Sequence, residues 1–430
     1  MVGIGVRSAR AVVIVIGVVL SAAGAYGGGF ALYEGSAHGN ATGGGMVARA
    51  GDASVLFYNP AGITRLPGTR ITAGVTAIVP TARVATVFDG ATTVEQTEPE
   101  IWTVPHLYVS YQGSPIVWYA LGVFSRFGLG TAYSPDWAGR YNTVKGMIRT
   151  VSVNPNIAVK ANEHLSLSMG LSWTWMDLCL TQKIDFSSIQ APDPDTYDAD
   201  IDQALSGNGC APGFTAAAHW RISNRLAFGI SYWSKIRQHL TGRADFTKPV
   251  ALQAVAPAVF NDTAVSGDVT LPDMLFVGLS VQPFAGCTLE LGGIRTGWSS
   301  YQSLDIHYDV PILPGVSTTR RQARWHDVWR IHVGLAYRAS EVLDLRFGYV
   351  WDPTPVPDAT ADYLVPANDR RLFCLGLGVH GKHWRLDLSY GYLRVKDRSV
   401  AARPAEGILD STFEAGCAHL IGLSLSRDFW

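Results

Sequence analysis

The sequence predicts an all-β fold: a fourteen-stranded antiparallel transmembrane β-barrel with an N-terminal plug in its lumen. Three observations support this prediction. Apolar and polar residues alternate with a period of two along much of the chain, the first 25 residues have the pattern of an export signal, and no later segment has the composition of a spanning helix. The composition agrees, because only 16% of the 430 residues are charged, whereas soluble domains carry about 25%.

Residues 1–25 are expected to be a cleaved signal peptide. It consists of a positively charged start, an apolar run and a small-residue cleavage site, which are Arg7 with Arg10, Ala11–Leu20, and Ala23-Gly24-Ala25. The apolar run has ten residues, whereas a helix needs about 20 to cross a bilayer. The mature chain should therefore begin near Tyr26 after export.

Residues 26–68 are rich in glycine and show no sustained alternation, so we do not expect them to form a wall strand. They precede the first segment that does alternate. The lumen of a closed barrel is the natural place for such a segment. We therefore expect residues 26–68 to form a hatch that plugs the barrel, and residues 69–430 to form the barrel with its long extracellular loops.

The alternation defines the strands. In residues 165–175, leucine, methionine and tryptophan occupy one face, and serine, glycine and threonine occupy the other. Fourteen segments qualify as strands: 69–80, 103–113, 115–127, 147–160, 164–180, 212–222, 224–240, 270–282, 286–300, 326–338, 342–352, 370–381, 383–396 and 416–430. An even number is the rule for bacterial barrels, in which closure leaves no strand edge unpaired in lipid.

A soluble β-sandwich would show the same alternation, so the pattern alone does not choose between sandwich and barrel. Aromatic residues favour the barrel, because pairs such as Trp329 and Tyr337 bracket a strand as expected at two membrane interfaces. These two residues are separated by about 26 Å along the strand, or about 20 Å along the normal of a tilted strand. The long connections, expected to face outward, are 181–211, 241–269, 301–325, 353–369 and 397–415.

The five cysteines have no spacing that would bind zinc. Cys179 and Cys210 bracket a polar, acidic stretch, and a disulfide between them could staple a long loop in an oxidising compartment. Five unpaired cysteines that pack as small apolar residues are the alternative. The eleven histidines likewise lack a third ligand at a suitable spacing, so we expect no metal.

Several motifs resemble the FadL-type outer-membrane transporters (OMPP1/FadL/TodX), which take up long-chain fatty acids and, in some members, aromatic hydrocarbons. The most specific is Gly51–Ile63 (GDASVLFYNPAGI), which is similar to the N-terminal hatch of that family. Other similar segments follow in the same order: 28–37, 104–108, 127–130, 136–141, 153–158, 271–273, 297–299 and 352–358. The resemblance covers nearly all of the mature chain and implies a fourteen-stranded barrel with a hatch.

The resemblance also implies passive uptake of hydrophobic compounds, most of all long-chain fatty acids, with aromatic hydrocarbons as the alternative. In this family the ligand reaches a pocket beside the hatch and leaves sideways, through a gap at an inward kink of the third strand. By position, Phe127 and Gly128 are the candidates for that kink. The candidates for gating by the hatch are Phe30, Leu32, Asn59, Pro60 and Ala61.

The Asn59-Pro60 pair has a structural alternative, because asparagine before proline can fix a rigid bend without any gating role. Three arginines on polar strand faces, Arg330, Arg346 and Arg385, could bind a ligand carboxylate bidentately. Ion pairs with Asp344 and Asp387 inside the barrel are the more common arrangement for such arginines.

Other classes of function find little support. A net charge of −1 without basic runs offers no surface for nucleic acid, and no catalytic or phosphate-binding motif occurs, so we expect neither an enzyme nor a cofactor. An outer-membrane lipase and a general porin are the remaining rivals, although an open pore has no use for a plug. We expect a monomer in the outer membrane of a Gram-negative cell, whose partners are a hydrophobic ligand, membrane lipid and the barrel assembly machinery.

Overall fold

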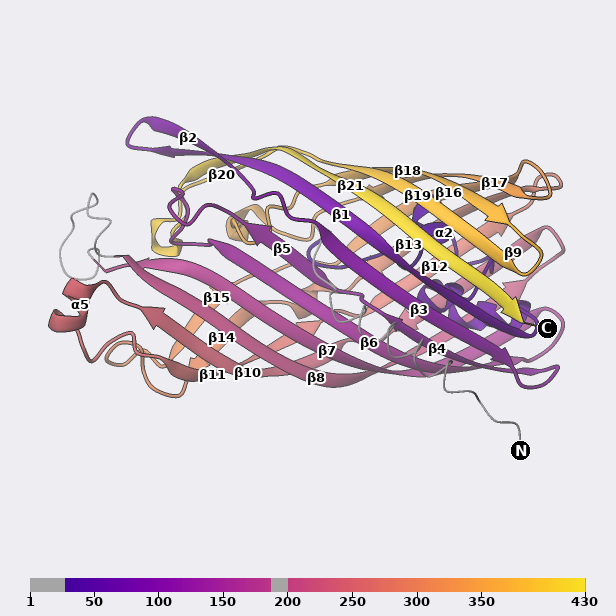
Figure 1. The fold of residues 1–430 in the computed structure, drawn as a ribbon, viewed down its shortest axis with the longest axis horizontal. Coiled ribbons are helices and arrows are strands. Elements are labelled where there is room, and N and C mark those ends of the chain that lie inside the picture. Colours follow the sequence, from indigo (N-terminus) through magenta and orange to yellow (C-terminus); the bar gives the residue numbers. More distant parts are fainter. Residues whose placement is uncertain (1–27, 187–199, 430) are drawn as a thin grey trace.

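The computed structural model describes residues 28–186 and 200–429, and these form one antiparallel sheet of 21 strand segments (Figure 1). The predicted signal peptide lies outside the described residues. Strand β1 (Thr69–Phe88) pairs with the last strand, β21 (Asp410–Phe429), from Thr69 opposite Phe429 to Val87 opposite Asp410. This pairing closes the sheet into a barrel, so the first and last strands leave no free edge in lipid.

The barrel has fourteen wall strands, as predicted, because bends and bulges divide several of them into two segments. Between β1 and β21 the order is β3 (Trp102–Gln112), β4–β5 (Val117–Phe124, Gly128–Ala132), β6 (Lys145–Lys160), β7 (Leu165–Asp185), β8 (Asp200–Arg221), β9–β10 (Leu226–Trp233, Ile236–Thr247), β11–β12 (Thr263–Leu271, Met274–Val281), β13–β14 (Cys287–Thr296, Ser303–Tyr308), β15–β16 (Thr318–Gln322, Val328–Arg338), β17 (Leu343–Asp352), β18 (Arg370–His380) and β19–β20 (Trp384–Val395, Arg398–Val400). The short strand β2 (Ala91–Gln96) folds back on β1 as a hairpin.

The wall is polar inside and apolar outside. On β7, Leu167, Met169, Leu171 and Trp173 are 47–64% exposed, while the serine, glycine and threonine side chains between them are buried. The same arrangement holds on β19, where exposed Trp384, Leu388, Tyr390 and Tyr392 alternate with buried Asp387 and Ser389. An outer surface of this composition suits a bilayer, and its aromatic residues suit the two interfaces.

Several strands extend further than the sequence pattern predicted. Residues 200–211 and 241–247 were expected to lie in loops, yet they form the outer parts of β8 and β10. Above the lipid the outward face is no longer apolar, so the alternation fades although the hydrogen-bonded ladder continues. The sequence pattern therefore identified the part of each strand that faces lipid.

The disulfide considered between Cys179 and Cys210 is wrong, because both cysteines are free. They lie on adjacent strands, but Cys179 pairs with Ser206 and Cys210 pairs with Trp175, four positions away along the ladder. Residues at such an offset are too far apart for a disulfide, whose Cα atoms lie about 4.4–6.8 Å from each other.

The helices are short. Three lie near the N-terminus, namely α2 (Ala37–Ala41), α3 (Val55–Tyr58) and the 3-10 helix η1 (Pro60–Arg65); the others are α5 (Val250–Val255), η3 (Trp298–Ser300), η4 (Asp358–Thr360) and η5 (Pro404–Glu406). In the described ranges no helix is both long and apolar enough to cross a membrane.

Residues 28–66, here called the N-terminal segment, cross the lumen. Helix α2 contacts β1, β17, β18, β19 and β21, while η1 contacts β4, β6, β7 and β8 on another part of the wall. In Figure 1, α2 lies within the outline of the barrel. Most of this segment is buried, so it fills the space that the wall encloses.

Candidate functional site

The third wall strand is broken at the position predicted for an inward kink. Strand β4 ends at Phe124, opposite Ser152 of β6, and β5 begins at Gly128, opposite Arg149. Three residues of the broken strand therefore face only two of β6, which is a bulge, and bulges bend the strand that carries them. The Thr150 side chain replaces backbone hydrogen bonds of the ladder at this point. Its Oγ1 accepts from Phe127 N at 3.2 Å and donates to Phe127 O at 2.7 Å.

Beside this bulge the ladder of the wall is interrupted. Strand β3 pairs with β4 only from Leu107 to Gln112, and its residues 102–106 pair with β1 alone. Among the described residues β3 and β5 do not pair, although Glu98 N donates to Ala132 O further out at 2.8 Å. We call this interruption, between residues 102–106 and 128–132, the wall gap.

Side chains close the wall gap. Trp102 is 8% exposed and lies across Gly130, so close that any side chain at position 130 would collide with the indole ring. A glycine is therefore needed at Gly130 for the backbone of β5 to lie against this ring. The gap is thus closed by van der Waals packing in place of a ladder, and packing of this kind can open without breaking strand hydrogen bonds.

The N-terminal segment docks onto the bulge. Leu32 N donates to Arg126 O at 2.8 Å, Gly128 N donates to Phe30 O at 2.9 Å, and Ala31 pairs with Phe127 in an isolated antiparallel bridge. The backbone groups that the bend frees are therefore satisfied by the N-terminal segment. This brings together four of the residues predicted for the site: Phe30, Leu32, Phe127 and Gly128.

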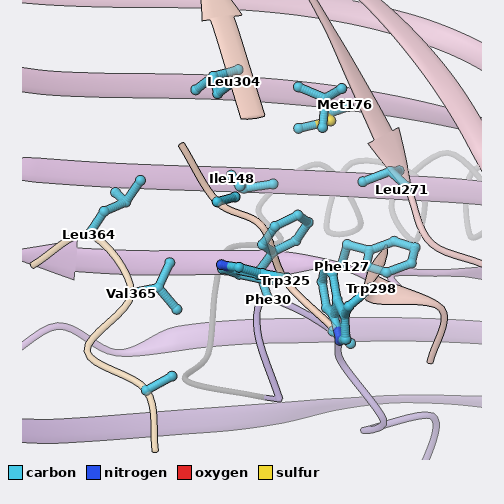
Figure 2. Close-up of a cluster of buried hydrophobic side chains, with 14 of the residues drawn as sticks. Phe30, Phe127, Ile148, Met176, Leu271, Trp298, Leu304, Trp325, Leu364 and Val365 are labelled. Atoms are coloured by element: carbon cyan, nitrogen blue, oxygen red, sulfur yellow. The ribbon is translucent and has the colours of Figure 1, made fainter. Parts of the chain in front are cut away.

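An aromatic cluster supports this docking. The Phe30 ring lies 4.6 Å from Trp298 and 5.6 Å from Trp325, measured between ring centroids, and 6.1 Å from Phe127. Figure 2 shows these four rings side by side. Sequence analysis did not select the two tryptophans, which come from distant outer segments near β13 and β16, since only the fold brings them to Phe30.

A small internal cavity of about 20 Å³ lies between residues 31–34 and the inner wall. Its apolar lining is Ile78, Val350, Leu372, Leu393, Ala418 and Leu420. These side chains belong to the same buried cluster as Leu32, Trp102 and Val104. One continuous apolar cluster therefore connects the cavity to the wall gap.

The polar end of this cavity carries two arginines. Arg330 donates to Gly43 O at 3.0 Å, lies 3.7 Å from an Asp352 oxygen and stacks on the Tyr33 ring, while Arg370 is paired with Asp352. Burial raises the pKa of Glu34, in spite of the opposing effect of both arginines, and so favours its protonated form. Asp352 thus lies close to both guanidinium groups at this end of the cavity.

The other predicted arginines form ion pairs. Arg346 bonds to Asp387 at 2.7 Å and to Asp344 at 3.1 Å, and Arg385 bonds to Asp387 at 2.8 Å. Arg385 also pairs with Asp52 and donates to Gly51 O at 3.0 Å, so it joins the N-terminal segment to the wall. The structure therefore brings only Arg330 of the three candidates to the cavity.

His38 completes this charged network, with its Nδ1 2.8 Å from Asp52. His38, Asp52 and Asp387 have potential ligand atoms within 4.8 Å of one another, which is a spacing that metal sites also show. Here the guanidinium of Arg385 lies among the same atoms and bonds to both carboxylates. An arginine thus supplies the positive charge that a metal ion would bring.

Asn59 forms hydrogen bonds both within the N-terminal segment and to the barrel wall. Its Oδ1 accepts from Ala61 N at 3.1 Å, and its Nδ2 donates to Val47 O at 2.8 Å and to Ala218 O of β8 at 3.0 Å. Pro60, which has no N–H to satisfy, is the first residue of η1. Asn59 therefore caps η1 and fixes this helix against the barrel. These contacts form a rigid bend, which is the structural role that sequence analysis gave as the alternative to gating.

The far end of the N-terminal segment lies near the short turns. Thr64 Oγ1 donates to Ser166 Oγ at 2.6 Å, and Trp118 Nε1 donates to Leu66 O at 2.9 Å. Ser166 and Trp118 both lie at the ends of their strands, beside the short connections. The N-terminal segment is therefore also bonded to the wall at this end of the lumen.

Comparisons with known proteins agree with this geometry. The family described as outer membrane protein transport protein (OMPP1/FadL/TodX) matches residues 18–429. Similar proteins include the putative outer membrane protein NMB0088 of Neisseria meningitidis serogroup B, 26% identical over 437 residues and 92% of each chain, and the long-chain fatty acid transport protein of Salmonella typhi, 23% identical over 437 residues, 96% of this chain and 97% of the other.

Solved structures share the fold. A Pseudomonas aeruginosa FadL homologue is 18% identical, with a TM-score of 0.83 over 94% of this chain and 100% of that one. The Pseudomonas putida toluene transporter TodX is 16% identical, with a TM-score of 0.68 over 95% of this chain and 99% of the other. Of these two proteins only TodX is named for a ligand, and a shared fold at this level of identity does not select a substrate for this chain.

Proposed function

The chain belongs to the outer membrane protein transport protein family (OMPP1/FadL/TodX) and is an outer-membrane channel for hydrophobic compounds rather than an enzyme; within that family, we propose that it takes up long-chain fatty acids and releases them sideways through the wall gap. The hatch role of the N-terminal segment is part of this proposal. Uptake is passive, because burial of the acyl chain supplies the free energy of capture.

The observation that carries the proposal is the two-part lining of the cavity. A fatty acid has a long apolar chain and one carboxylate, and the cavity offers six apolar side chains beside Arg330 and Arg370. Each buried CH₂ contributes about 0.8 kcal/mol, and a charge-assisted hydrogen bond to arginine contributes about 1.5–3 kcal/mol. A ligand carboxylate could bind a guanidinium at this polar end while its acyl chain packs on the apolar lining.

Leu32 links capture to release in this proposal. Its side chain belongs to the cluster that lines the cavity, and its backbone N–H bonds to Arg126 in the bulge. A ligand that pushes Leu32 aside therefore strains the bond that docks the N-terminal segment. Undocking frees residues 125–128, and the acyl chain can then pass Trp102 into the bilayer.

Aromatic hydrocarbons are the alternative substrates, and the aromatic cluster around Phe30 favours them. Rings of Phe30, Trp298 and Trp325 lie beside the wall gap and would pack well against a planar ligand. A neutral hydrocarbon has no charged group that could bind the two arginines of the cavity, so the two substrate classes depend on different residues.

Uptake by cells that lack other fatty acid channels tests the proposal. We expect labelled oleate to enter cells that produce the protein, with and without an uncoupler, and toluene to enter no faster than in cells with an empty vector. Toluene uptake alone would favour the alternative, and uptake of neither would reject transport. The matched pair Arg330→Gln and Arg225→Gln, the second being an arginine in a short turn, should differ in oleate uptake by about tenfold or more.

A further inference from the structure

Arg126 is a buried arginine without a counter-ion. It lies in the bulge between β4 and β5, it is 2% exposed, and its Nε and Nη1 atoms have no hydrogen-bond acceptor. No carboxylate among the described residues forms an ion pair with it. Moving a charged group out of water is costly, and proteins almost always pair such a group.

Aromatic rings compensate only part of this cost. The guanidinium carbon lies 4.5 Å from the centre of the Trp233 ring and 5.4 Å from that of Phe127. Cation–π contacts of this kind are favourable when desolvated, but they satisfy none of the N–H groups of arginine. A positive charge with free donors therefore remains buried between the bulge and Trp233 of β9.

The neighbouring rings add further unused donors. Trp233 and Trp298 are both fully buried, and the Nε1 of each has no acceptor. Trp298 lies 6.3 Å from the Phe127 ring, beside Phe30 (Figure 2). A buried cation with free N–H groups, stacked on an indole ring whose own N–H has no acceptor, is complementary to an anion. A carboxylate has two acceptor oxygens and a negative charge, and it fits a guanidinium bidentately.

We propose that Arg126 binds the carboxylate of the ligand at the wall gap, and that it thereby selects acids over neutral hydrocarbons at the exit. The inference rests on the proposed function and adds a second anion site, distinct from Arg330 and Arg370 in the cavity. The acyl chain then points through the gap toward lipid while the charged end stays with Arg126. Only after the tail is in the bilayer does the head leave the protein.

A purely structural Arg126 would behave differently. If the guanidinium served only to hold Trp233 and Phe127 in place, its loss would affect acids and neutral ligands alike. If it binds carboxylate, its loss affects acids alone. A comparison of oleate with its neutral ester, methyl oleate, therefore separates the two roles in one protein.

The test uses the full-length mature protein in detergent, checked for folding by its heat-modifiable migration. We expect Arg126→Met to weaken oleate binding about 10- to 100-fold, to leave methyl oleate binding within about twofold, and Arg126→Lys to retain part of the oleate affinity. Arg237→Met, an exposed arginine on β10, is the matched control and should change neither affinity. If Arg126→Met does not fold, Arg126→Gln takes its place with the same expectation.

Two results would overturn the inference: oleate affinity that is unchanged in the variants, or equal losses for oleate and methyl oleate. Both leave the proposed function standing, because the parent protein still binds and transports oleate. Failure of the parent itself to bind or take up oleate would instead reject the proposed function, and the anion site with it.

Discussion

A disulfide between the N-terminal segment and the bulge should stop transport without stopping binding. Ala31 and Phe127 are partners in an isolated antiparallel bridge, so their Cα atoms are about 4.5–5.5 Å apart. This distance is within the range that disulfides accept, about 4.4–6.8 Å. The double variant Ala31→Cys with Phe127→Cys should therefore cross-link with little movement, in a background where exposed Cys210 is replaced by serine.

The size of the expected effect follows from the free energy with which the N-terminal segment docks onto the bulge. Two backbone hydrogen bonds, of 2.8 and 2.9 Å, contribute about 0.5–1.5 kcal/mol each, and burial of the Phe30 ring adds about 1.5–3 kcal/mol. Undocking therefore costs roughly 3–6 kcal/mol, so the docked form prevails by a factor of roughly 10²–10⁴ until a ligand offsets the cost. A covalent link removes the undocked form altogether.

Uptake of labelled oleate, with and without dithiothreitol, measures the effect of the link. The oxidised double variant should take up oleate at the rate of cells without the protein, and reductant should restore uptake. Purified oxidised protein should still bind oleate within about threefold of the reduced form. Each single cysteine variant controls for the lost side chain. Undiminished uptake by fully cross-linked protein would refute the account of gating.

The other predictions concern the N-terminal segment. Deletion of residues 30–65 should raise the conductance of single channels in planar bilayers severalfold, and a parent that already conducts like an open pore would contradict the plug. Asn59→Ala leaves Val47 O and Ala218 O without their donor, so docking should weaken by about 2–4 kcal/mol and proteolysis of the segment should become faster. Burial, together with repulsion from Arg346 and Arg385, lowers the pKa of His38 to about 4, against the raising effect of Asp52; the Asp387 carboxylate also lies nearby. An undocked His38 binds a proton near pH 6.5, so docking is most stable above that pH and loses up to about 3 kcal/mol as the pH falls toward 4. The protection of amides in residues 36–52 from hydrogen exchange, taken relative to the intrinsic exchange rate at each pH, should therefore be lower at pH 4.5 than at pH 7, and the difference should be much smaller in His38→Gln; identical pH dependence in the variant would show that another group is responsible.

The fold was predictable because lipid imposes a strict pattern. Where β7 faces the bilayer, every second residue must be apolar, and the alternation from Leu165 to Trp175 shows it directly. Beyond the bilayer that requirement ends, and the extensions of β8 and β10 were missed for this reason. The disulfide between Cys179 and Cys210 failed on register, which a sequence does not specify when neither residue is tied to a turn.

The candidate site could be predicted only where residues adjacent in the sequence form it. Phe127 and Gly128 lie at the break because a bulge is a local feature, and Asn59-Pro60 bends the chain for reasons contained in two residues. The cavity, by contrast, draws its lining from six wall strands and the N-terminal segment, and the aromatic cluster joins Phe30 to residues almost 300 positions away. The alternation of inward and outward side chains along each strand could have identified Asp352 and Arg370, because they share the inner face with Val350 and Leu372. That Arg126 has no partner is a property of the folded chain alone.

Sideways release is the central claim, and photo-crosslinking of a ligand in transit tests it most directly. A fatty acid with a diazirine near the end of its tail, added to the protein in bilayers and irradiated, labels whatever the tail contacts. The account predicts labelled peptides from the wall gap, which contain Trp102, Val104 or residues 128–132. Labels confined to the cavity and to the periplasmic end of the N-terminal segment, around Thr64 and Ser166, would show that the ligand leaves along the barrel axis and would contradict it.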